Sequence, residues 1–330
     1  MEYSDIIEYY EKYSQYNDLC NEISYILRKR FKKDKIPVAL ITHRVKSFDS
    51  ISRKMKIHKY QNIYNDIRDI AGVRLVYLYL DDKNKIRQAI REEFSVIETK
   101  DTTVGKTVNS FGYSDVKFYV KLGKQKGARY DDLKDLLCEI QVRTVMQDAW
   151  GIMSHHLDYK SEIGLPNELK RKLHKMAALL EAADDNFDSI RIEKEKYRKD
   201  INNKRLQNEQ EYFKQHLNSD TIESYLNFRF KEEVNYNKEH LEKIILALKE
   251  AKYFTLLDIK DLLDRTNEAL VKFYQDKYNK RLEDVDVVGA EILDWALYFD
   301  KPRPLIGWLA FKTPEKEDKY RKLIKPRKKS

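Results

Sequence analysis

The stretch DIAGVRLVYLY, residues 69–79, decides the fold class. It is rich in β-branched and aromatic residues and has few polar ones, so it predicts a buried strand that is entered after Gly72. Elsewhere in the first half, apolar spacing predicts helices over 3–33 (one or two), 47–56, 82–94 and 144–160, and strands from 95, over 113–122 and over 135–143. Strands interspersed with helices indicate an α/β (α+β) domain.

The second half has a different composition. Proline is absent between Pro166 and Pro302, and glycine is absent between Gly164 and Gly289. The segment is rich in Leu, Glu, Lys and Ala, which favours a mainly α-helical domain, with one long helix or a pair over 168–217. We therefore expect two domains, residues 1–195 and residues 196–330.

An aromatic cluster and a basic tail lie near the end of the chain. Trp295, Tyr298, Phe299, Trp308 and Phe311 surround two prolines and are interpreted as core or as a domain contact, with a partner surface as the alternative. Residues 319–330 are strongly basic, which is typical of a mobile terminus or of a contact with phosphates.

Composition narrows the functional classes. The 330 residues are 42% hydrophobic and 36% charged with a net charge of +9, which suits an anionic partner such as a nucleotide or RNA. No apolar run reaches about 18 residues, and the acidic N-terminus lacks a signal core, so we expect a cytoplasmic protein without a membrane contact. Cys20 and Cys138 are too few for a disulfide framework or a zinc site.

The segment RVKSFDSISRK, residues 44–54, concentrates cations and hydroxyls. Arg44 and Lys46 alternate on an extended stretch, Ser47 is a candidate helix cap, and Ser50 and Lys54 lie one helical turn apart. Such a set can hold a polyphosphate near a helix N-terminus. The alternative interpretation is a solvated basic helix.

Polar residues also mark the two predicted buried strands. Asp69 and Arg74 could place an acid and a base at a sheet edge, or form a structural salt bridge. Glu139, Gln141 and Arg143 alternate with apolar residues and therefore share one face of their strand. That face is either solvated or, if it is buried, in need of partners or a ligand.

Two aromatic or histidine-containing segments are less specific. Tyr113 follows Gly112 at a loop-to-strand junction, where its ring could stack on a base or join the core. His155 lies one helical turn before Tyr159 and a few residues after Trp150, in the segment WGIMSHHLDYK. A single helical histidine is usually structural.

Taken in order, these pieces resemble the synthetase domain of the RelA/SpoT family, the alarmone pyrophosphokinases. The matching segments are RVKSFDSISRK at 44–54, DIAGVR at 69–74, GYSDVK at 112–117, EIQVRT at 139–144 and WGIMSHHLDYK at 150–160. The resemblance covers about residues 15–195. It implies a nucleotidyltransferase-like mixed sheet flanked by helices.

The resemblance also implies a reaction: transfer of pyrophosphate from ATP to the 3′-hydroxyl of GDP or GTP, which gives (p)ppGpp and AMP. Mg²⁺ would be held by Asp69 and Glu139, and Glu139 would accept the proton of the attacking hydroxyl. The other implied roles are ATP binding by Arg44, Lys46, Ser50, Lys54 and Arg74, phosphate contacts by Arg143, orientation of the acceptor by Gln141, and acceptor binding by Tyr113, Lys117 and His155.

Two departures from the family pattern concern the acceptor. Lys117 stands where the family motif has histidine, and Asp115 stands where it has serine. The sequence also lacks an HD dipeptide, so we expect no alarmone hydrolase activity.

Three functions therefore stay open. The first is synthesis of guanosine alarmones. The second is a toxin-type synthetase that modifies the 3′ CCA end of tRNA or makes adenosine alarmones, restrained or triggered through its C-terminal domain by a protein trigger or antitoxin. The third is a catalytically dead nucleotide- or RNA-binding module. Small synthetases of this family often form homo-oligomers, which is a further possible partnership.

Overall fold

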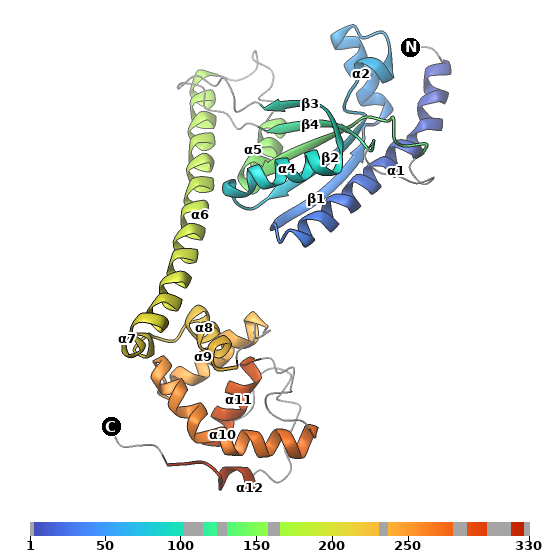
Figure 1. Cartoon of the computed structure of the whole chain (residues 1–330). Helices are drawn as coiled ribbons and strands as arrows, with labels where there is room; N and C mark the ends of the chain where they lie inside the picture. Colours follow the sequence, from blue (N-terminus) through green and yellow to red (C-terminus); the bar gives the residue numbers. More distant parts are fainter. Residues whose placement is uncertain are drawn as a thin grey trace. The chain divides into compact units, whose positions relative to one another are not determined.

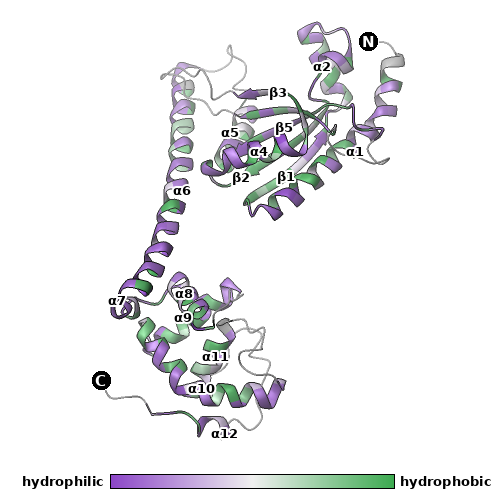
Figure 2. Ribbon diagram, viewed as in Figure 1, coloured by the Kyte–Doolittle hydropathy of each residue, from purple (hydrophilic) through white to green (hydrophobic). Residues whose placement is uncertain are grey.

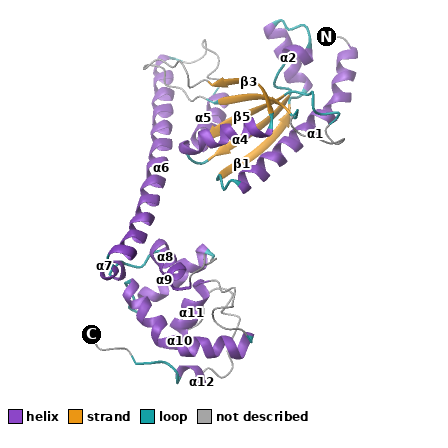
Figure 3. Cartoon of the chain, in the orientation of Figure 1, coloured by secondary structure: helices purple, strands orange, loops and turns teal. Residues whose placement is uncertain are grey.

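The computed structural model describes residues 3–101, 115–123, 131–157, 166–230, 237–279, 289–301 and 318–326. The chain divides into two compact units, Met1–Arg191 and Ile192–Ser330. The first contains a mixed sheet with helices, and the described part of the second is mainly helical (Figures 1 and 3). The predicted fold class is confirmed. Within the described residues, no helix has the length and apolarity to span a membrane.

The sheet of the first unit has five described strands in the order β1-β2-β5-β4-β3. The central pair, β2 and β5, is parallel, and every other pair is antiparallel. The strands are β1 (Val38–Val45), β2 (Ala71–Tyr77), β3 (Ser95–Asp101), β4 (Val116–Lys121) and β5 (Cys138–Thr144).

Helices of the first unit follow the predicted spans closely. Residues 3–33 form one helix, and Ser47 caps α2 by accepting a hydrogen bond from the backbone N–H of Ser50. The described helices are α1 (Tyr3–Lys33), α2 (Phe48–His58), α3 (Ile63–Asp66), the 3₁₀ helix η1 (Leu80–Asp82), α4 (Lys83–Glu93), α5 (Val145–His156) and α6 (Asn167–Gln207), which continues into the second unit.

The structure corrects the strand prediction at two points. Gly72 lies inside β2, one residue after its start, rather than before the strand. The extended segment before α2 is a full edge strand, β1, because its backbone pairs with β2 from Val38 to Val45. The predicted loop and the start of the strand at Tyr113 lie outside the described residues.

The two faces of the sheet differ in polarity. Val73, Ile140 and Phe118 are aligned neighbours on β2, β5 and β4, and all three are fully buried. They join residues of α1 and α4 in one hydrophobic core, which also contains both free cysteines. The opposite face carries the polar residues of the same strands, because side chains alternate along each strand.

The second unit has its own hydrophobic core. Its described helices are the end of α6, α7 (Glu209–Phe213), α8 (Ser219–Phe230), α9 (Lys238–Glu250), α10 (Leu256–Tyr278), α11 (Gly289–Asp300) and α12 (Asp318–Arg321). Of the two predictions for residues 168–217, the pair of helices is correct: α6 ends at Gln207, and Asn208 caps α7. In Figure 2, α6 is mainly hydrophilic, whereas α9 to α11 carry hydrophobic stretches.

Trp295 and Phe299 of the predicted aromatic cluster are buried in this second core. The ring centroid of Trp295 lies 4.3 Å from that of Phe273. In the same unit, the Arg265 guanidinium donates to Asp300 (2.6 Å), which ties α10 to the end of α11. Trp308 and Phe311 lie outside the described residues.

The core of the first unit gives a stability prediction. Replacing Ile140 with alanine removes a fully buried side chain from the centre of β5. We expect the free energy of unfolding to fall by about 2–5 kcal/mol, from lost burial and the cavity left behind. Urea unfolding of the full chain measures this change.

Ile97→Ala is the matched control, because Ile97 on β3 is 56% exposed. It should cost less than about 0.5 kcal/mol. Equal losses for the two variants would contradict the assignment of the core face.

Candidate active site

The polar face of the sheet is built in rows, because paired residues on adjacent strands place their side chains on the same face. One row crosses all five strands and consists of Arg44, Gly72, Glu139, Tyr119 and Glu98. The next row consists of Thr42, Arg74, Gln141, Lys117 and Lys100. The strand register alone therefore brings together residues from distant parts of the sequence.

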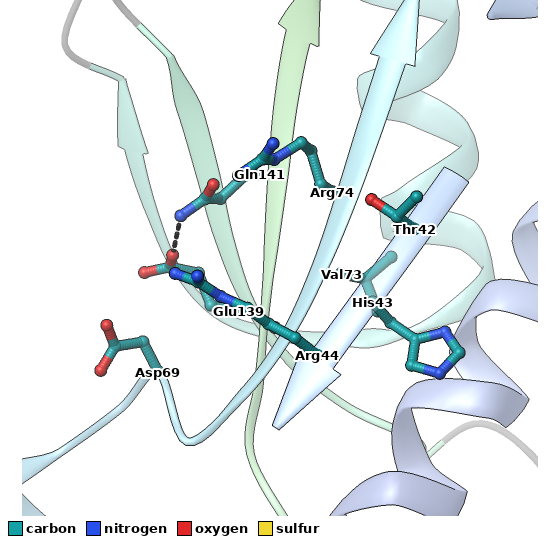
Figure 4. Close-up of a pocket in the computed structure, with 9 residues that line it drawn as sticks. Thr42, His43, Arg44, Asp69, Val73, Arg74, Glu139 and Gln141 are labelled. Atoms are coloured by element: carbon teal, nitrogen blue, oxygen red, sulfur yellow. Dashed lines mark hydrogen bonds between the residues drawn. The ribbon is translucent and has the colours of Figure 1, made fainter. Parts of the chain in front are cut away.

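A pocket of about 200 Å³ opens on this face. Gly72 has no side chain, so the row is open between Arg44 on one side and Glu139 on the other. Figure 4 shows the pocket residues Thr42, His43, Arg44, Asp69, Val73, Arg74, Glu139 and Gln141. Five of the residues that the sequence singles out thus line one cavity.

Asp69 lies on the loop that precedes β2 and is held by two lysines. Lys46 Nζ donates to its Oδ2 (2.5 Å), and Lys54 Nζ donates to its Oδ1 (2.9 Å). Burial raises the pKa of Asp69, but the two lysines outweigh burial and keep this pKa below its ordinary value. The carboxylate is therefore ionised, and the segment 44–54 supplies its counterions.

Glu139 is the buried acid of the site, with 3% of its surface exposed. Gln141 Nε2 donates to its Oε1 (2.5 Å), as Figure 4 shows, and Lys117 Nζ lies 3.7 Å from the same oxygen. Tyr119 of β4 is the residue paired with Glu139 in the strand register and lies beside it on the polar face. A charge buried to this extent needs such partners, and here they come from its own strand and the next one.

Arg74 and Arg143 are organised by acids at the other end of the polar face. Arg143 donates to Asp115 Oδ2 (2.7 Å), and Asp148 Oδ1 on α5 lies 3.7 Å from Arg143 and 3.4 Å from Arg74. Gly151, also on α5, lies against Arg143: a Cβ atom there would lie 2.4 Å from the guanidinium. Helix α5 therefore packs over this end of the polar face.

The structure does not gather every residue that the sequence singles out. Ser50 is exposed on α2, with its Oγ 2.9 Å from Ser47 Oγ. His155 is exposed in the last turn of α5 and is not among the residues that line the pocket. Tyr113 lies outside the described residues. Asp69 and Arg74 do not form the suggested salt bridge, since Asp69 pairs with lysines and Arg74 pairs with Asp148.

Several residues of the site were not anticipated from the sequence. Asp148 and Gly151 are three residues apart and therefore share one face of α5. Only the packing of α5 against the sheet shows that this face lies against Arg143. Tyr119 follows Lys117 by two residues, so strand alternation could have placed it on the same face. Thr42 and His43 gave no signal, because β1 was not recognised as a strand.

Comparison with known proteins places the part of the chain that carries this site beside a known family. Residues 43–164 match the family described as a region found in RelA / SpoT proteins. This range contains every described residue of the pocket except Thr42. The resemblance that the sequence motifs indicated is thus confirmed for residues 43–164, which match this region.

Individual relatives agree with this assignment. The chain is 23% identical over 188 residues to the GTP pyrophosphokinase YjbM of Bacillus subtilis, covering 55% of this chain and 85% of that protein. It is 26% identical over 163 residues to the GTP pyrophosphokinase YwaC of the same organism, covering 48% and 75%. A solved structure of a GTP pyrophosphokinase family protein from Streptococcus pneumoniae matches with a TM-score of 0.50 and 25% identity, over 58% of this chain and 96% of that one. About half of the chain is therefore similar in sequence to GTP pyrophosphokinases.

Because Gly151 lies against Arg143, replacing this glycine should affect stability and nucleotide binding in opposite directions. In Gly151→Ala the new methyl group displaces the flexible end of Arg143, while alanine favours the helix by about 0.5–1 kcal/mol. We expect an unchanged or higher melting temperature together with an affinity for nucleoside triphosphate reduced on the order of 10-fold. Thermal unfolding and calorimetric titration with a non-hydrolysable ATP analogue measure the two effects.

Gly123→Ala is the matched control, since its new methyl group would meet Ser95 at an ordinary 3.4 Å. It should leave nucleotide affinity unchanged. Unaltered affinity in Gly151→Ala would show that the position of Arg143 does not matter for binding.

Proposed function

We propose that this protein transfers the β,γ-pyrophosphate of ATP to the 3′-hydroxyl of a guanosine nucleotide, giving (p)ppGpp and AMP. The observation that carries the proposal is the shared pocket of Asp69, Glu139, Arg44 and Arg74 inside a RelA/SpoT domain. Two acids beside several cations suit a reaction in which a polyphosphate is held and a hydroxyl is deprotonated. The named relatives are GTP pyrophosphokinases, which supports the same reaction.

The cations around the pocket are the proposed ATP site. Arg44 is exposed at the pocket wall, where its guanidinium is free to lie against the adenine or a phosphate. Lys46 lies between β1 and α2, and Lys54 lies on α2. Both donate to Asp69, so both ammonium groups are within reach of one polyphosphate. Arg74 and Arg143, fixed by Asp148, complete the set, and Ser50 is an exposed hydroxyl on α2.

Mg²⁺ is the cofactor that this donor set fits. Asp69 and Glu139 line the same pocket with carboxylate oxygens, and Mg²⁺ in nucleotide sites is typically held by one or two carboxylates plus phosphate oxygens. Among the described residues no cluster of three or more acidic, histidine or cysteine ligands occurs, which suits a metal that is shared with the substrate. Both oxygens of Asp69 accept from lysines, so binding of the metal requires at least one lysine to turn toward the phosphates. The metal would neutralise charge on the transferred group.

Glu139 is the proposed general base. The acceptor 3′-oxygen attacks the β-phosphorus of ATP, the bond from that phosphorus to the α,β-bridging oxygen breaks, and AMP leaves. The proton of the attacking hydroxyl passes to the Glu139 carboxylate, which Gln141 and Lys117 keep in place. Gln141, bonded to Glu139 and lining the pocket, is placed to orient the acceptor.

The acceptor side is where this chain departs from the family motif. Lys117 lies against Glu139, so a fixed positive charge replaces the motif's histidine at this place. Acceptor diphosphates would be attracted to it, which supports GDP or GTP. The same charge also suits a larger anion, so the 3′ end of tRNA or an adenosine nucleotide is the second candidate. Tyr113 and His155 stay proposed acceptor contacts on the resemblance alone.

The second unit is proposed to be regulatory. The RelA/SpoT match ends at residue 164, and residues 192–330 have a core of their own. We propose residues 1–195 as the synthetase domain and 196–330 as a domain that restrains or triggers it. If the protein is a toxin-type synthetase, a protein partner would act through this second domain. Use of ATP and GTP fits a cytoplasmic reaction.

Glu139→Gln is the direct test of the proposed chemistry. The amide keeps the shape of the side chain but does not accept a proton, so transfer should fall by about 10²- to 10⁴-fold. Binding of an ATP analogue should be retained. The assay is release of AMP from ATP with GDP or GTP as acceptor, beside calorimetric titration.

The matched control is Glu92→Gln, which alters an exposed glutamate that pairs with Arg30 away from the pocket. It should keep full activity. Wild-type rates in Glu139→Gln would overturn the assignment of the base, and an inactive wild type would overturn the proposed function.

A labelling assay with four candidate acceptors, each tested separately, identifies the acceptor. ATP radiolabelled at its γ-phosphate is offered with GDP, GTP, unlabelled ATP or deacylated tRNA in the presence of Mg²⁺. We expect label on a guanosine nucleotide, and in Lys117→Ala we expect the acceptor KM to rise on the order of 10-fold while the KM for ATP stays constant. Label on tRNA or an adenosine nucleotide alone would establish the toxin-type reading instead.

A further inference from the structure

Helix α6 contacts the first unit along one of its faces. Asp184, Asp188 and Arg191 are spaced by four and then three residues, so they lie on the same side of the helix. The Asp188 carboxylate accepts from the backbone N–H of Asp81 (3.2 Å), and Arg191 forms an ion pair with Asp82, whose side chain is buried. These two contacts hold α6 against the segment that follows β2.

Asp184 is buried on this face of α6, with 5% of its surface exposed. Thr144, which is fully buried at the end of β5, donates from its Oγ1 to Asp184 Oδ2 (2.5 Å). A buried carboxylate needs such a partner, and here the partner is the residue that joins β5 to α5. The proposed reaction gives Asp184 no role, and the family match ends before it, at residue 164.

The hydroxyl of Thr144 also begins helix α5. It accepts from the backbone N–H of Gln147 (3.1 Å), and the Gln147 side chain accepts from the backbone N–H of Thr144 (2.9 Å), which together form a capping box. A hydroxyl donates one hydrogen bond and accepts others, so its contacts with Asp184 and Gln147 form together. Asp184 thereby directs the hydroxyl that caps α5.

The start of α5 carries the acid that faces two arginines of the site. Asp148 directly follows Gln147 in the first turns of the helix. Its Oδ1 lies 3.4 Å from Arg74 and 3.7 Å from Arg143. The attraction between opposite charges weakens with distance, so a displaced start of α5 would loosen both arginines. The position of the arginines thus depends on the cap at Thr144.

We propose that Asp184 is a positioning residue for the nucleotide-binding arginines. Its bond to Thr144 holds the start of α5, so that Asp148 stays beside Arg74 and Arg143 where phosphates bind them. This inference rests on the proposed function of the two arginines. Asp184 is not among the residues that line the pocket and acts through Thr144 and Asp148. The site is thereby extended to α6, the helix that continues into the second unit.

Asp184→Ala tests the proposal, because it removes the carboxylate that holds Thr144 and leaves a residue that favours the helix. We expect the affinity for a non-hydrolysable ATP analogue to fall on the order of 5-fold, measured by calorimetric titration well below the melting temperature. A purely structural role would lower the melting temperature and leave this affinity unchanged. An affinity within about 2-fold of the wild type would overturn the proposal.

Asp185→Ala is the matched control. Asp185 is the next residue on α6 and is exposed, so the variant should keep the wild-type affinity. If Asp184→Ala does not fold, Asp184→Asn takes its place. The amide keeps the shape of the side chain and forms only a neutral, weaker bond with Thr144, so the affinity should fall about 3-fold. An affinity equal to that of the wild type would then count against the proposal.

An Asp148→Ala background shows whether Asp184 acts through Asp148. The arginines have already lost this partner there, so Asp184→Ala should lower the affinity by less than about 2-fold. An equal loss in both backgrounds would contradict the proposed route.

Thermal unfolding tests the same network without nucleotide. The double variant of Asp184→Ala and Asp148→Ala should melt about 2 °C higher than the sum of the two separate losses predicts, because residues of one network are not additive. Additive losses would refute the network, and the positioning role with it. A wild type that does not bind the analogue but shows this coupling would refute the proposed function and leave the contact of α6 with the start of α5 standing.

Discussion

The parallel pairing of β2 with β5 is the constraint on which the site depends. It sets Gly72 beside Glu139 and Arg74 beside Gln141, and the antiparallel neighbours β1 and β4 then add Arg44 and the residues of β4. A shift of one residue in this register would turn Glu139 toward the hydrophobic core formed with α1 and α4. The burial of Val73, Ile140 and Phe118 on one face therefore holds the acids and cations on the other.

Charge balance is the second requirement of the polar face. Each carboxylate that faces inward has cationic or amide partners: Asp69 has two lysines, and Glu139 has Gln141 and Lys117. An ionised group with so little exposure is destabilising without such partners. In the proposed reaction, the lysines that neutralise Asp69 are also the groups that a polyphosphate attracts, so stability and substrate binding draw on the same cations.

The two units are independent in their cores. The first buries its sheet against α1 and α4, and the second buries the aromatic residues of α10 and α11, with Arg265 and Asp300 at its edge. The RelA/SpoT match is confined to the first. Because each unit has its own hydrophobic core, substitutions in the second core are expected to change its stability while leaving the residues of the pocket in place.

Local sequence patterns were sufficient to predict much of the secondary structure and part of the candidate site. The alternation at 139–143, the cap at Ser47 and the helical second half follow from the periods of strand and helix, and the ordered motifs indicated the family and five residues of the pocket. The tertiary structure alone decided that Val38–Val45 is the edge strand and that Asp148 and Gly151 place Arg143. It also decided that Tyr119 is paired with Glu139, while Ser50 and His155 stay exposed. These contacts join residues far apart in the chain, and their register is set by packing of the opposite, hydrophobic face, which no local period encodes.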